Sequence, residues 1–232
     1  MYDRSSRYYD LIYSFKDYAA EAETVRQAIE RYKRSDGTRL LDVACGTGKH
    51  LEHLRQWFEV EGLDQSEEMV SIASERLPDV RISRGDMRDF DLGRQFDVIT
   101  CLFSAIGYLH TQEALENACA CFARHLVPGG VLLFEPWIKP DQWRDGFLGM
   151  ETFSSDDIKI ARFSKSHREG LVTTVPFVYC VLTRSGFQMF EETHVLRMAP
   201  HDDYLKAIEL AGMGPLHEPV GPMGRGLYVG LR

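Results

Sequence analysis

Two carboxylates and two glycines between Leu40 and Asp64 have the types and the spacing of a ligand site. Asp42 lies near the end of one short apolar run, Asp64 ends a second, and Gly46 and Gly48 follow the first. Glycine has no Cβ, so the backbone can pass close to a ligand. A carboxylate at the end of the second run can accept hydrogen bonds from both hydroxyls of a ribose. The stretch therefore predicts a βαβ unit with a ligand site at its carboxyl edge.

Two ligand classes use this geometry, and the residues around the glycines distinguish them. A dinucleotide site needs G-x-G-x-x-G, with the diphosphate at the helix N-terminus, but the third glycine position is Leu51. S-adenosylmethionine has no phosphate and is cationic, and Asp42 just before the glycines can face that charge. The run 42–48 closely resembles motif I of class I methyltransferases. The plain alternative, a structural turn in another α/β protein, requires two acids and two glycines to coincide.

Two later segments suggest the other parts of the same site. Gly85-Asp86-Met87 resembles the adenine site of methyltransferases, in which the acid accepts from the exocyclic amine and the apolar side chain covers the ring. The alternative for Asp86 is a turn residue. The segment from Phe103 to Tyr108 follows an apolar strand and crosses the carboxyl edge, where class I methyltransferases place the acceptor atom.

The chemistry of methyl transfer limits what the acceptor site must contain. The methyl group of S-adenosylmethionine is already activated, so an enzyme mostly holds nucleophile, methyl and sulfur in line in a dry pocket. An oxygen or carbon nucleophile also needs a base, whereas a neutral amine does not. No His-Asp pair occurs at this edge in the sequence; Ser104 and Tyr108 are its polar groups, with Tyr2 or Tyr13 available from the N-terminal segment. This set favours an amine that is positioned by hydrogen bonds.

The hydrophobic pattern predicts the elements that must position these residues. Together with the resemblance of the run 42–48 to motif I, these elements imply an α/β fold of the class I methyltransferase (Rossmann-like) type, a seven-stranded, mostly parallel sheet with helices on both faces. Expected strands cover 38–43, 60–63, 79–83, 96–101 and 131–135, with a turn at 127–130, and two short strands close the chain around Gly224-Arg225-Gly226. Expected helices cover 19–33, 47–58, 111–125 and 202–211, and Ser66 is expected to cap a further helix.

Two regions lie outside that core pattern. Residues 2–18 are rich in aromatic side chains, which predicts a helical lid that packs on the core, reaches the ligand with tyrosine hydroxyls, or both. Residues 153–198 hold alternating β-rich runs at 158–162, 172–175, 178–182 and 194–196, which predict inserted antiparallel strands. The expected division is a lid at 1–36, a cofactor-binding core at 37–137 and 199–232, and an insert at 138–198 that forms a substrate wall, a dimer contact or both.

Composition excludes several classes of protein. The 232 residues fit one domain with an insertion, and no apolar run of about 18 residues or signal-peptide pattern occurs. Five cysteines without disulfide spacing predict a reduced, cytoplasmic protein, and Cys119 and Cys121 face different sides of a helix, so no metal is expected. The net charge of −8 argues against nucleic-acid binding. It leaves room for one phosphorylated small molecule, because a local arginine can hold a diphosphate.

Nearly the whole chain resembles the nucleotide-sugar N,N-dimethyltransferases that make dimethylamino sugars for antibiotics. Motif I is common to many methyltransferases, whereas the Glu-Pro-Trp and Gly-Arg-Gly-Leu segments are much more specific. The motifs that carry the resemblance are Lys16-Asp17-Tyr18, the run 41–48, the run 85–90 with Leu92-Gly93-Arg94, Phe103-Ser104 with Gly107, Glu135-Pro136-Trp137, Arg168-Glu169-Gly170 and Gly224-Arg225-Gly226-Leu227.

The resemblance implies a reaction, a substrate and a set of site residues. It implies two successive methylations of the amine of a thymidine-diphosphate (TDP) 3-amino-deoxyhexose, with S-adenosylhomocysteine as product, in a homodimer. Tyr2 and Tyr108 match positions beside the amino sugar and are expected to orient it rather than act as a base. The implied cofactor-binding residues are Tyr13, Asp42, Ala44, Gly46, Gly48, Asp64, Gln65, Asp86, Met87 and Phe103. The implied substrate-binding residues are Tyr18, Ser104, Trp137 and Arg225, of which Arg225 matches the diphosphate-contacting arginine.

Two of these residues, and two histidines of the insert, have a simpler structural explanation. Arg225 could be a surface arginine in a turn, Trp137 a core residue, and His167 and His194 structural or exposed. The chain departs from the family in a shortened lid and in Ile138, where a second tryptophan is usual, so the exact sugar is open. The competing functions are a methyltransferase of the same fold acting at O or N of a non-nucleotide molecule, a non-catalytic S-adenosylmethionine-binding protein, and an NAD-dependent enzyme.

Overall fold

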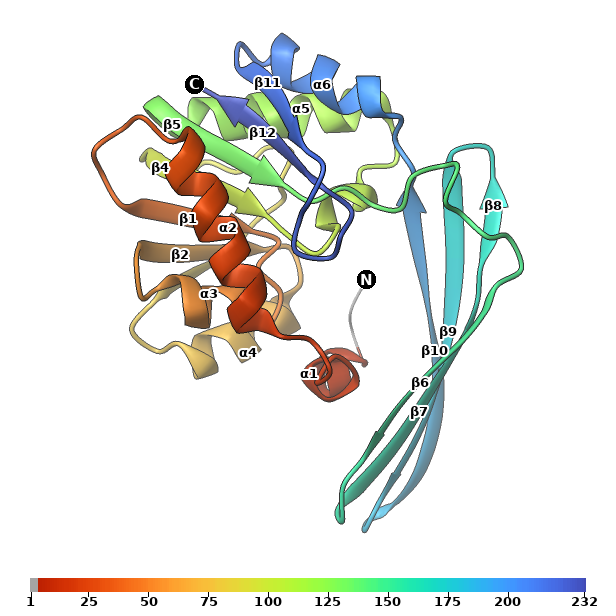
Figure 1. The fold of residues 1–232 in the computed structure, drawn as a ribbon. Coiled ribbons are helices and arrows are strands. Elements are labelled where there is room, and N and C mark those ends of the chain that lie inside the picture. The colour runs from red at the N-terminus through yellow and green to blue at the C-terminus, as the bar shows by residue number, and fades with distance from the viewer. Residues whose placement is uncertain (1–3) are drawn as a thin grey trace.

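The computed structural model describes residues 4–232 and contains two separate β-sheets (Figure 1). The first sheet has seven strands in the order β11-β12-β5-β4-β1-β2-β3. Strand β12 runs antiparallel to both of its neighbours, β11 and β5, whereas β5, β4, β1, β2 and β3 pair in parallel. The strands are β1 (Arg39–Val43), β2 (Glu59–Asp64), β3 (Arg81–Arg84), β4 (Phe96–Cys101), β5 (Leu126–Phe134), β11 (Gly214–Glu218) and β12 (Leu227–Leu231).

Helices cover both faces of this sheet and bury two apolar clusters against it (Figure 1). Helices α2 and α3 pack on one face through side chains such as Val25 and Leu54, and α5 and α6 pack on the other through Phe122 and Ile208. Strand β4, in the middle of the sheet, is buried along its whole length, as a strand covered on both faces must be. The helices are α2 (Tyr18–Tyr32), α3 (Lys49–Leu54), α4 (Glu67–Arg76), α5 (Gln112–Arg124) and α6 (His201–Leu210).

Short polar side chains begin three of these helices. Asp17 accepts a hydrogen bond from the amide of Ala20, Ser66 accepts from Met69, and Thr111 caps α5 in the same way. Each cap satisfies one of the amides that a helix N-terminus leaves without an intrahelical partner. The predicted cap at Ser66 is confirmed.

The second sheet is a long antiparallel ribbon of strands that extends away from the core (Figure 1). Its order is β10-β9-β7-β6, and β8 pairs with one end of β9. Its inner face carries buried side chains such as Ile160, Tyr179 and Phe190, whereas large apolar side chains on its outer face are exposed. The strands are β6 (Leu148–Ser154), β7 (Ile158–Lys165), β8 (His167–Glu169), β9 (Val172–Thr183) and β10 (Gly186–Arg197).

The N-terminal segment lies between the two sheets (Figure 1). It forms the single turn η1 (Ser6–Tyr8) and the short helix α1 (Tyr9–Ile12). Tyr8 and Ile12 pack against the inner face of the second sheet. Asp10 faces the core, where Thr47 Oγ1 donates to it at 2.7 Å and Arg76 forms an ion pair with it. The lid is therefore fixed to the glycine turn on one side and to the second sheet on the other.

The predicted fold class is confirmed, and the strands of the core fall within two residues of their predicted starts with one exception. The fifth strand was expected at 131–135, but β5 already begins at Leu126. Residues 127–130 bulge opposite the single residue Asp97, because the register shifts between Phe96 and Val98, and Gly129 has the left-handed φ of +76° that a turn uses, although β5 continues through them. The lid is also less helical than predicted where the structure describes it, because 6–12 are the helical residues among 4–17.

The insert contains more strand than predicted: β8 was not predicted, and β10 begins at Gly186 rather than at 194. Strand β6 was missed, and the runs 172–175 and 178–182 form the single strand β9 across Pro176. Pro176 pairs with Thr193 of β10, but on its other side it lies between the end of the β7 pairing at Phe177 and the start of the β8 pairing at Thr174. A proline without an N–H fits there because no neighbouring strand needs that donor.

Candidate functional site

The glycine turn after β1 and the carboxylate that ends β2 form one wall of the site. Gly46 has φ +55°, a left-handed conformation that favours glycine, and a Cβ built on it would meet no atom within 4 Å, so a ligand can approach the backbone there. Asp64 accepts hydrogen bonds from the amides of Gly46 at 2.8 Å and Ser66 at 2.9 Å. Burial raises the pKa of the Asp64 carboxyl, and these two amides oppose that rise.

The segment after β3 forms the adjoining wall. Asp86 accepts from the backbone amide and from Nε of Arg88, both at 2.9 Å, and from Nε2 of Gln65 at 3.1 Å. The hydrogen bonds from Arg88 lower the pKa of Asp86, so this carboxylate stays ionised and can accept a donor from a ligand. Met87 lies beside it on the cavity wall.

The turn after β4 holds two non-glycine residues in the left-handed region. Phe103 has φ +50° and Ser104 has φ +62°, which costs on the order of 1 kcal/mol each and persists only where neighbours fix it. Ser104 Oγ donates to the carbonyl of Pro136 at 2.7 Å and accepts from Arg225 at 2.6 Å. The Arg225 guanidinium also lies 4.9 Å from the centre of the Trp137 ring. These contacts join the ends of β4 and β5 to the loop between β11 and β12.

Buried charged side chains lie behind the turn after β4. The Lys16 side chain is 1% exposed, lies 3.8 Å from the Phe103 ring centre and forms an ion pair with Glu21 at 2.7 Å. Glu21 also contacts His50 at 2.8 Å. Glu135 Oε1 accepts from the amide of Met223 at 2.9 Å, and burial raises the pKa of Glu135 although Arg225 and Lys16 oppose that rise.

The lid and the second sheet supply an aromatic wall. Tyr13 packs edge-on against Phe103, with ring centres 5.1 Å apart. Its hydroxyl accepts a hydrogen bond from Arg162 at 3.0 Å. Arg162 is 3% exposed, and its guanidinium lies over the rings of Phe177 and Tyr13 at 4.4 and 4.9 Å. The buried cation therefore fixes a tyrosine of the lid from the opposite sheet.

These walls enclose one cavity of about 640 Å³ between the core, the lid and the second sheet. A cavity of this size can hold two small molecules or one large one. Eleven of the predicted site residues line it: Tyr13, Ala44, Gly46, Asp64, Gln65, Asp86, Met87, Phe103, Tyr108, Trp137 and Arg225. Phe15 and Ile138, where the chain departs from the family, line it as well.

Four predicted site residues do not line the cavity. Asp42 is buried under the glycine turn, where Thr100 Oγ1 donates to it at 2.7 Å, and Gly48 begins α3. Tyr18 packs on the His50 ring with its hydroxyl buried, and Ser104 is 1% exposed behind Arg225. All four support the wall from behind and do not face into the cavity. The remaining predicted site residue, Tyr2, lies outside the described residues.

Sequence reasoning gave no site role to Arg162 or to His194, and both line the cavity. His194 was expected to be structural or exposed; it is buried, and its Nδ1 lies 2.6 Å from the Tyr108 hydroxyl. Both residues occupy inward positions of strands that also carry buried apolar side chains on that face, such as Ile160 and Phe190. A charged or polar side chain beside apolar ones on the same strand face is the signal that could have identified them.

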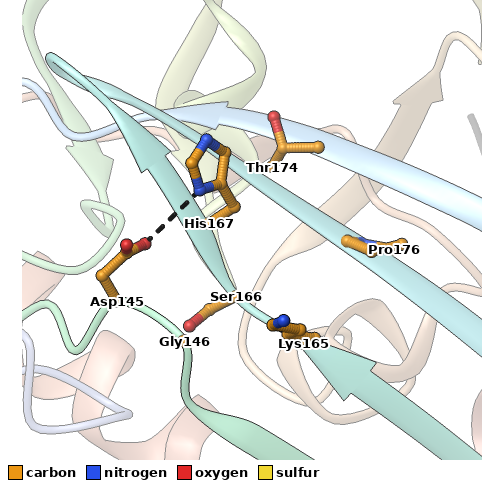
Figure 2. Close-up of a pocket in the computed structure, with 7 residues that line it drawn as sticks. All are labelled: Asp145, Gly146, Lys165, Ser166, His167, Thr174 and Pro176. Carbon is orange, nitrogen blue, oxygen red and sulfur yellow. Dashed lines mark ion pairs between the residues drawn. The ribbon is translucent and has the colours of Figure 1, made fainter.

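A second, smaller hollow of about 510 Å³ lies near the start of the second sheet, and Figure 2 shows its lining. His167 and Asp145 approach each other there at 3.8 Å, and both are well exposed. None of the predicted site residues lines it, although Ser166 borders both hollows. Among residues 4–232, no group of three or more His, Cys, Asp or Glu side chains could hold a metal ion, and no helix is long and apolar enough to cross a membrane.

Comparisons with known proteins agree with this geometry. Residues 40–130 match the protein family described as "Methyltransferase domain". The chain is 42% identical to the dTDP-3-amino-3,4,6-trideoxy-alpha-D-glucopyranose N,N-dimethyltransferase of Streptomyces venezuelae, over 96% of this chain and 95% of that protein. It is 43% identical to the dTDP-4-amino-2,3,4,6-tetradeoxy-D-glucose N,N-dimethyltransferase of Saccharopolyspora spinosa, over 97% and 91%.

A solved structure shows the same fold with a bound methyl donor. The S-adenosylmethionine (SAM)-bound CalS10, an amino pentose methyltransferase from Micromonospora echinaspora involved in calicheamicin biosynthesis, superposes with a TM-score of 0.87. Its sequence is 38% identical, and the match covers 100% of this chain and 98% of that chain.

The buried carboxyl of Asp42 generates a prediction about stability and pH. Burial raises the pKa of Asp42 to about 6, so the native state binds this proton more tightly than the unfolded state does. Stability from this group is therefore present at low pH and is lost as the pH rises through about 6. Because asparagine cannot ionise, the unfolding free energy of Asp42→Asn relative to wild type should rise by about 2–3 kcal/mol between pH 4 and pH 7.5. Denaturant unfolding at the two pH values measures this, and a pH-independent difference would contradict it.

Proposed function

Because the chain belongs to the family of dTDP-amino-sugar N,N-dimethyltransferases, we propose that it methylates the amine of a TDP-linked 3-amino-deoxyhexose twice, with S-adenosylmethionine as donor. The observation that carries the proposal is one cavity that contains both the glycine turn with Asp64 and the half-buried Arg225. The relatives include enzymes named for 3-amino and for 4-amino sugars. A non-nucleotide substrate, the alternative from the sequence, is not favoured by these relatives.

The donor fits the wall formed by the ends of β1, β2 and β3. We assign the ribose to Asp64, the adenine to Met87, Asp86 and Gln65, and the methionine portion to the open backbone at Ala44 and Gly46. The support is that all of these residues line one continuous surface. Phe103 and Tyr13, packed on each other, would cover the donor and exclude water. Asp42 and Gly48 shape the turn from behind.

The nucleotide sugar fits the opposite part of the cavity. The Arg225 side chain is half-buried and its hydrogen-bond partner Ser104 is neutral, so the guanidinium can still bind a diphosphate. Trp137 supports the guanidinium from one side and would form the floor of the sugar pocket. Lys16 brings a second positive charge behind Phe103, and Tyr18 packs beside it. A doubly charged diphosphate would be attracted by both cations.

The reaction requires positioning more than acid–base chemistry. Bound S-adenosylmethionine supplies a methyl group on a positively charged sulfur. The chain must then exclude water, bring the amine in its neutral form to the methyl and hold the nitrogen lone pair in line. Tyr108 lies on the cavity wall where it can hydrogen-bond the amine. An orienting role for Tyr2 stays a prediction.

Mass spectrometry of the reaction products tests the proposed function. Purified protein with S-adenosylmethionine and a TDP-3-amino-deoxyhexose should give a product heavier by one methyl substitution, about 14 mass units, and then one heavier by two, since a monomethyl amine keeps a lone pair. The corresponding 4-amino sugar and a non-nucleotide amine serve as comparison substrates. No mass gain with any nucleotide-linked amino sugar would refute the proposal.

Substitution of Arg225 tests whether the diphosphate binds where we propose. Arg225→Ala should raise the KM for the nucleotide sugar about tenfold to a hundredfold, because a charge-assisted contact to phosphate is worth about 1.5–3 kcal/mol. The KM for S-adenosylmethionine should change little. Arg184→Ala, at an exposed hairpin turn of the second sheet, is the matched control and should leave both constants unchanged. Equal effects of Arg225→Ala on both ligands would argue against this assignment.

We also propose that the protein is a homodimer that uses the outer face of the second sheet. That face carries a continuous apolar stripe on four adjacent strands, and the same stripe on a second copy is its natural complement. Residues 138–198 would then serve as substrate wall on one face and dimer contact on the other, beside a lid at 1–36 and a core at 37–137 and 199–232. A cytoplasmic location also stays a prediction. The exposed residues of the stripe are Leu148, Met150, Phe163, Leu182, Phe187 and Met189.

Sedimentation measures the oligomeric state directly. Wild type should sediment at twice the chain mass of 26.6 kDa, whereas Phe187→Glu combined with Met189→Glu should sediment as a monomer, because two buried charges would oppose association. Leu210→Glu, at an equally exposed leucine on α6, is the control and should remain dimeric. A monomeric wild type, or a double variant that stays dimeric, would contradict the proposal.

A further inference from the structure

The Tyr108 hydroxyl is held by a residue of the second sheet. Its oxygen lies 2.6 Å from Nδ1 of His194, and Nε2 of the same ring lies 4.0 Å from Oε2 of Glu192. Tyr108 belongs to the short turn η2 (Ala105–Tyr108) of the core, whereas His194 and Glu192 are both on β10. Phe177 packs edge-on against the imidazole at 5.2 Å, so the ring is fixed in place.

The surroundings decide which nitrogen of His194 carries the proton. Burial lowers the pKa of His194 to about 4; Arg162 also lowers it, and Glu192 raises it. The imidazole is therefore neutral near pH 7 and has a single N–H. Nε2 faces the carboxylate of Glu192, which favours the proton on that nitrogen. Nδ1 then has a lone pair, and Tyr108 must be the donor of the hydrogen bond between them.

Glu192 is itself held in place. Its Oε1 accepts from the backbone amide of Ser5 at 2.9 Å, and the Ser5 hydroxyl donates to its Oε2. A continuous set of contacts therefore connects Ser5 of the lid, through Glu192 and His194, to Tyr108 at the cavity. A fixed carboxylate beside an imidazole sets the tautomer of the ring, as an outer partner does for other functional histidines.

We propose that His194, held by Glu192, is a positioning residue: it accepts the hydrogen bond from the Tyr108 hydroxyl. The Tyr108 oxygen can then act only as an acceptor, for an N–H of the substrate amine. The direction of this hydrogen bond matters for methyl transfer. A Tyr108 that donated to the amine would occupy the nitrogen lone pair, which is the electron pair needed for the attack. A Tyr108 that accepts leaves the lone pair free to point at the methyl group. This inference rests on the proposed amine methylation.

The transfer itself needs no further group from the chain. The nitrogen lone pair forms the new N–C bond, the C–S bond breaks, and its electron pair stays on sulfur, which becomes neutral. The positive charge passes to nitrogen, and the acceptor oxygen of Tyr108 stabilises the N–H as this charge develops. The product ammonium then loses its proton to solvent water before the second transfer. In that second step the neutral amine has a single N–H, so its orientation depends on one acceptor.

Two substitutions of nearly equal size separate positioning from packing. His194→Leu removes the acceptor, whereas His194→Asn can place an amide oxygen near the position of Nδ1. His194→Leu should lower kcat about tenfold, the worth of one buried hydrogen bond, with little change in the KM for either ligand, and should leave more monomethyl product. His194→Asn should restore most of the kcat and of the dimethyl product. His167→Leu, at an exposed histidine of the same sheet, should behave as wild type.

A double-mutant cycle shows whether His194 acts through Tyr108. Tyr108→Phe should lower kcat to a similar extent, and adding His194→Leu to it should change kcat by less than about twofold. Full additivity of the two losses, or a failure of asparagine to restore activity, would overturn the inference. A wild type that methylates no nucleotide-linked amino sugar would instead refute the proposed function, and this inference with it.

An NMR measurement that needs no turnover tests the inference even if the variants fold poorly. The ¹⁵N chemical shifts of the His194 ring in the wild-type protein should show a protonated Nε2 and an unprotonated Nδ1 near pH 7. Glu192→Gln should reduce this preference. A ring protonated at Nδ1 would overturn the inference even if every variant were inactive.

Discussion

The contact between Arg225 and Ser104 is the interaction on which the site depends. It joins the strained turn after β4 to the loop between β11 and β12, at 2.6 Å, while Trp137 at the end of β5 covers the guanidinium. A buried charge is unfavourable unless it is paired or hydrogen-bonded. Arg225 and Lys16 therefore sit near Glu135 and Glu21, and these contacts fix the rear of the cavity before any ligand binds.

The cavity has its front wall only because the second sheet stands opposite the core. The lid bridges the gap: Asp10 is bound to the core through Thr47, and Tyr13 is bound to the second sheet through Arg162. The same strands that carry Arg162 and His194 inward carry an apolar stripe outward, because side chains alternate along a strand. One sheet can thus shape the substrate pocket and present an interface with its other face.

The parts of the site that are local in sequence could be predicted. Asp64 follows Gly46 through one βαβ unit, so the pattern of that stretch fixes its shape, and the Asp86 segment follows the next strand in the same way. The parts formed by long-range pairing could not. Tyr108 and His194 are separated by 86 positions, and their contact depends on how β10 lies against the turn after β4.

Local rules also misled where tertiary packing overrode them. Pro128-Gly129-Gly130 has the composition of a turn, and Gly129 has the left-handed φ of a turn, yet β5 continues through this segment because β4 pairs with the strand on both sides of it. The runs on either side of Pro176 were predicted as separate strands, but a gap between the neighbouring strands lets one strand continue through the proline. Tyr18, which the resemblance implies as a substrate-binding residue, packs on His50 behind the wall, and its role toward the substrate stays a prediction. In each case the deciding contact is distant in the chain.

The central claim is that one cavity between two sheets holds both reactants, with the amine at Tyr108 and the diphosphate at Arg225. A crystal structure with S-adenosylhomocysteine and a TDP-amino sugar tests it most directly. We expect the amine nitrogen within hydrogen-bond distance of the Tyr108 hydroxyl, about 3–3.5 Å from the position of the transferable methyl, and phosphate oxygens on the Arg225 guanidinium. A nucleotide sugar bound elsewhere, with Arg225 making no phosphate contact, would contradict the account.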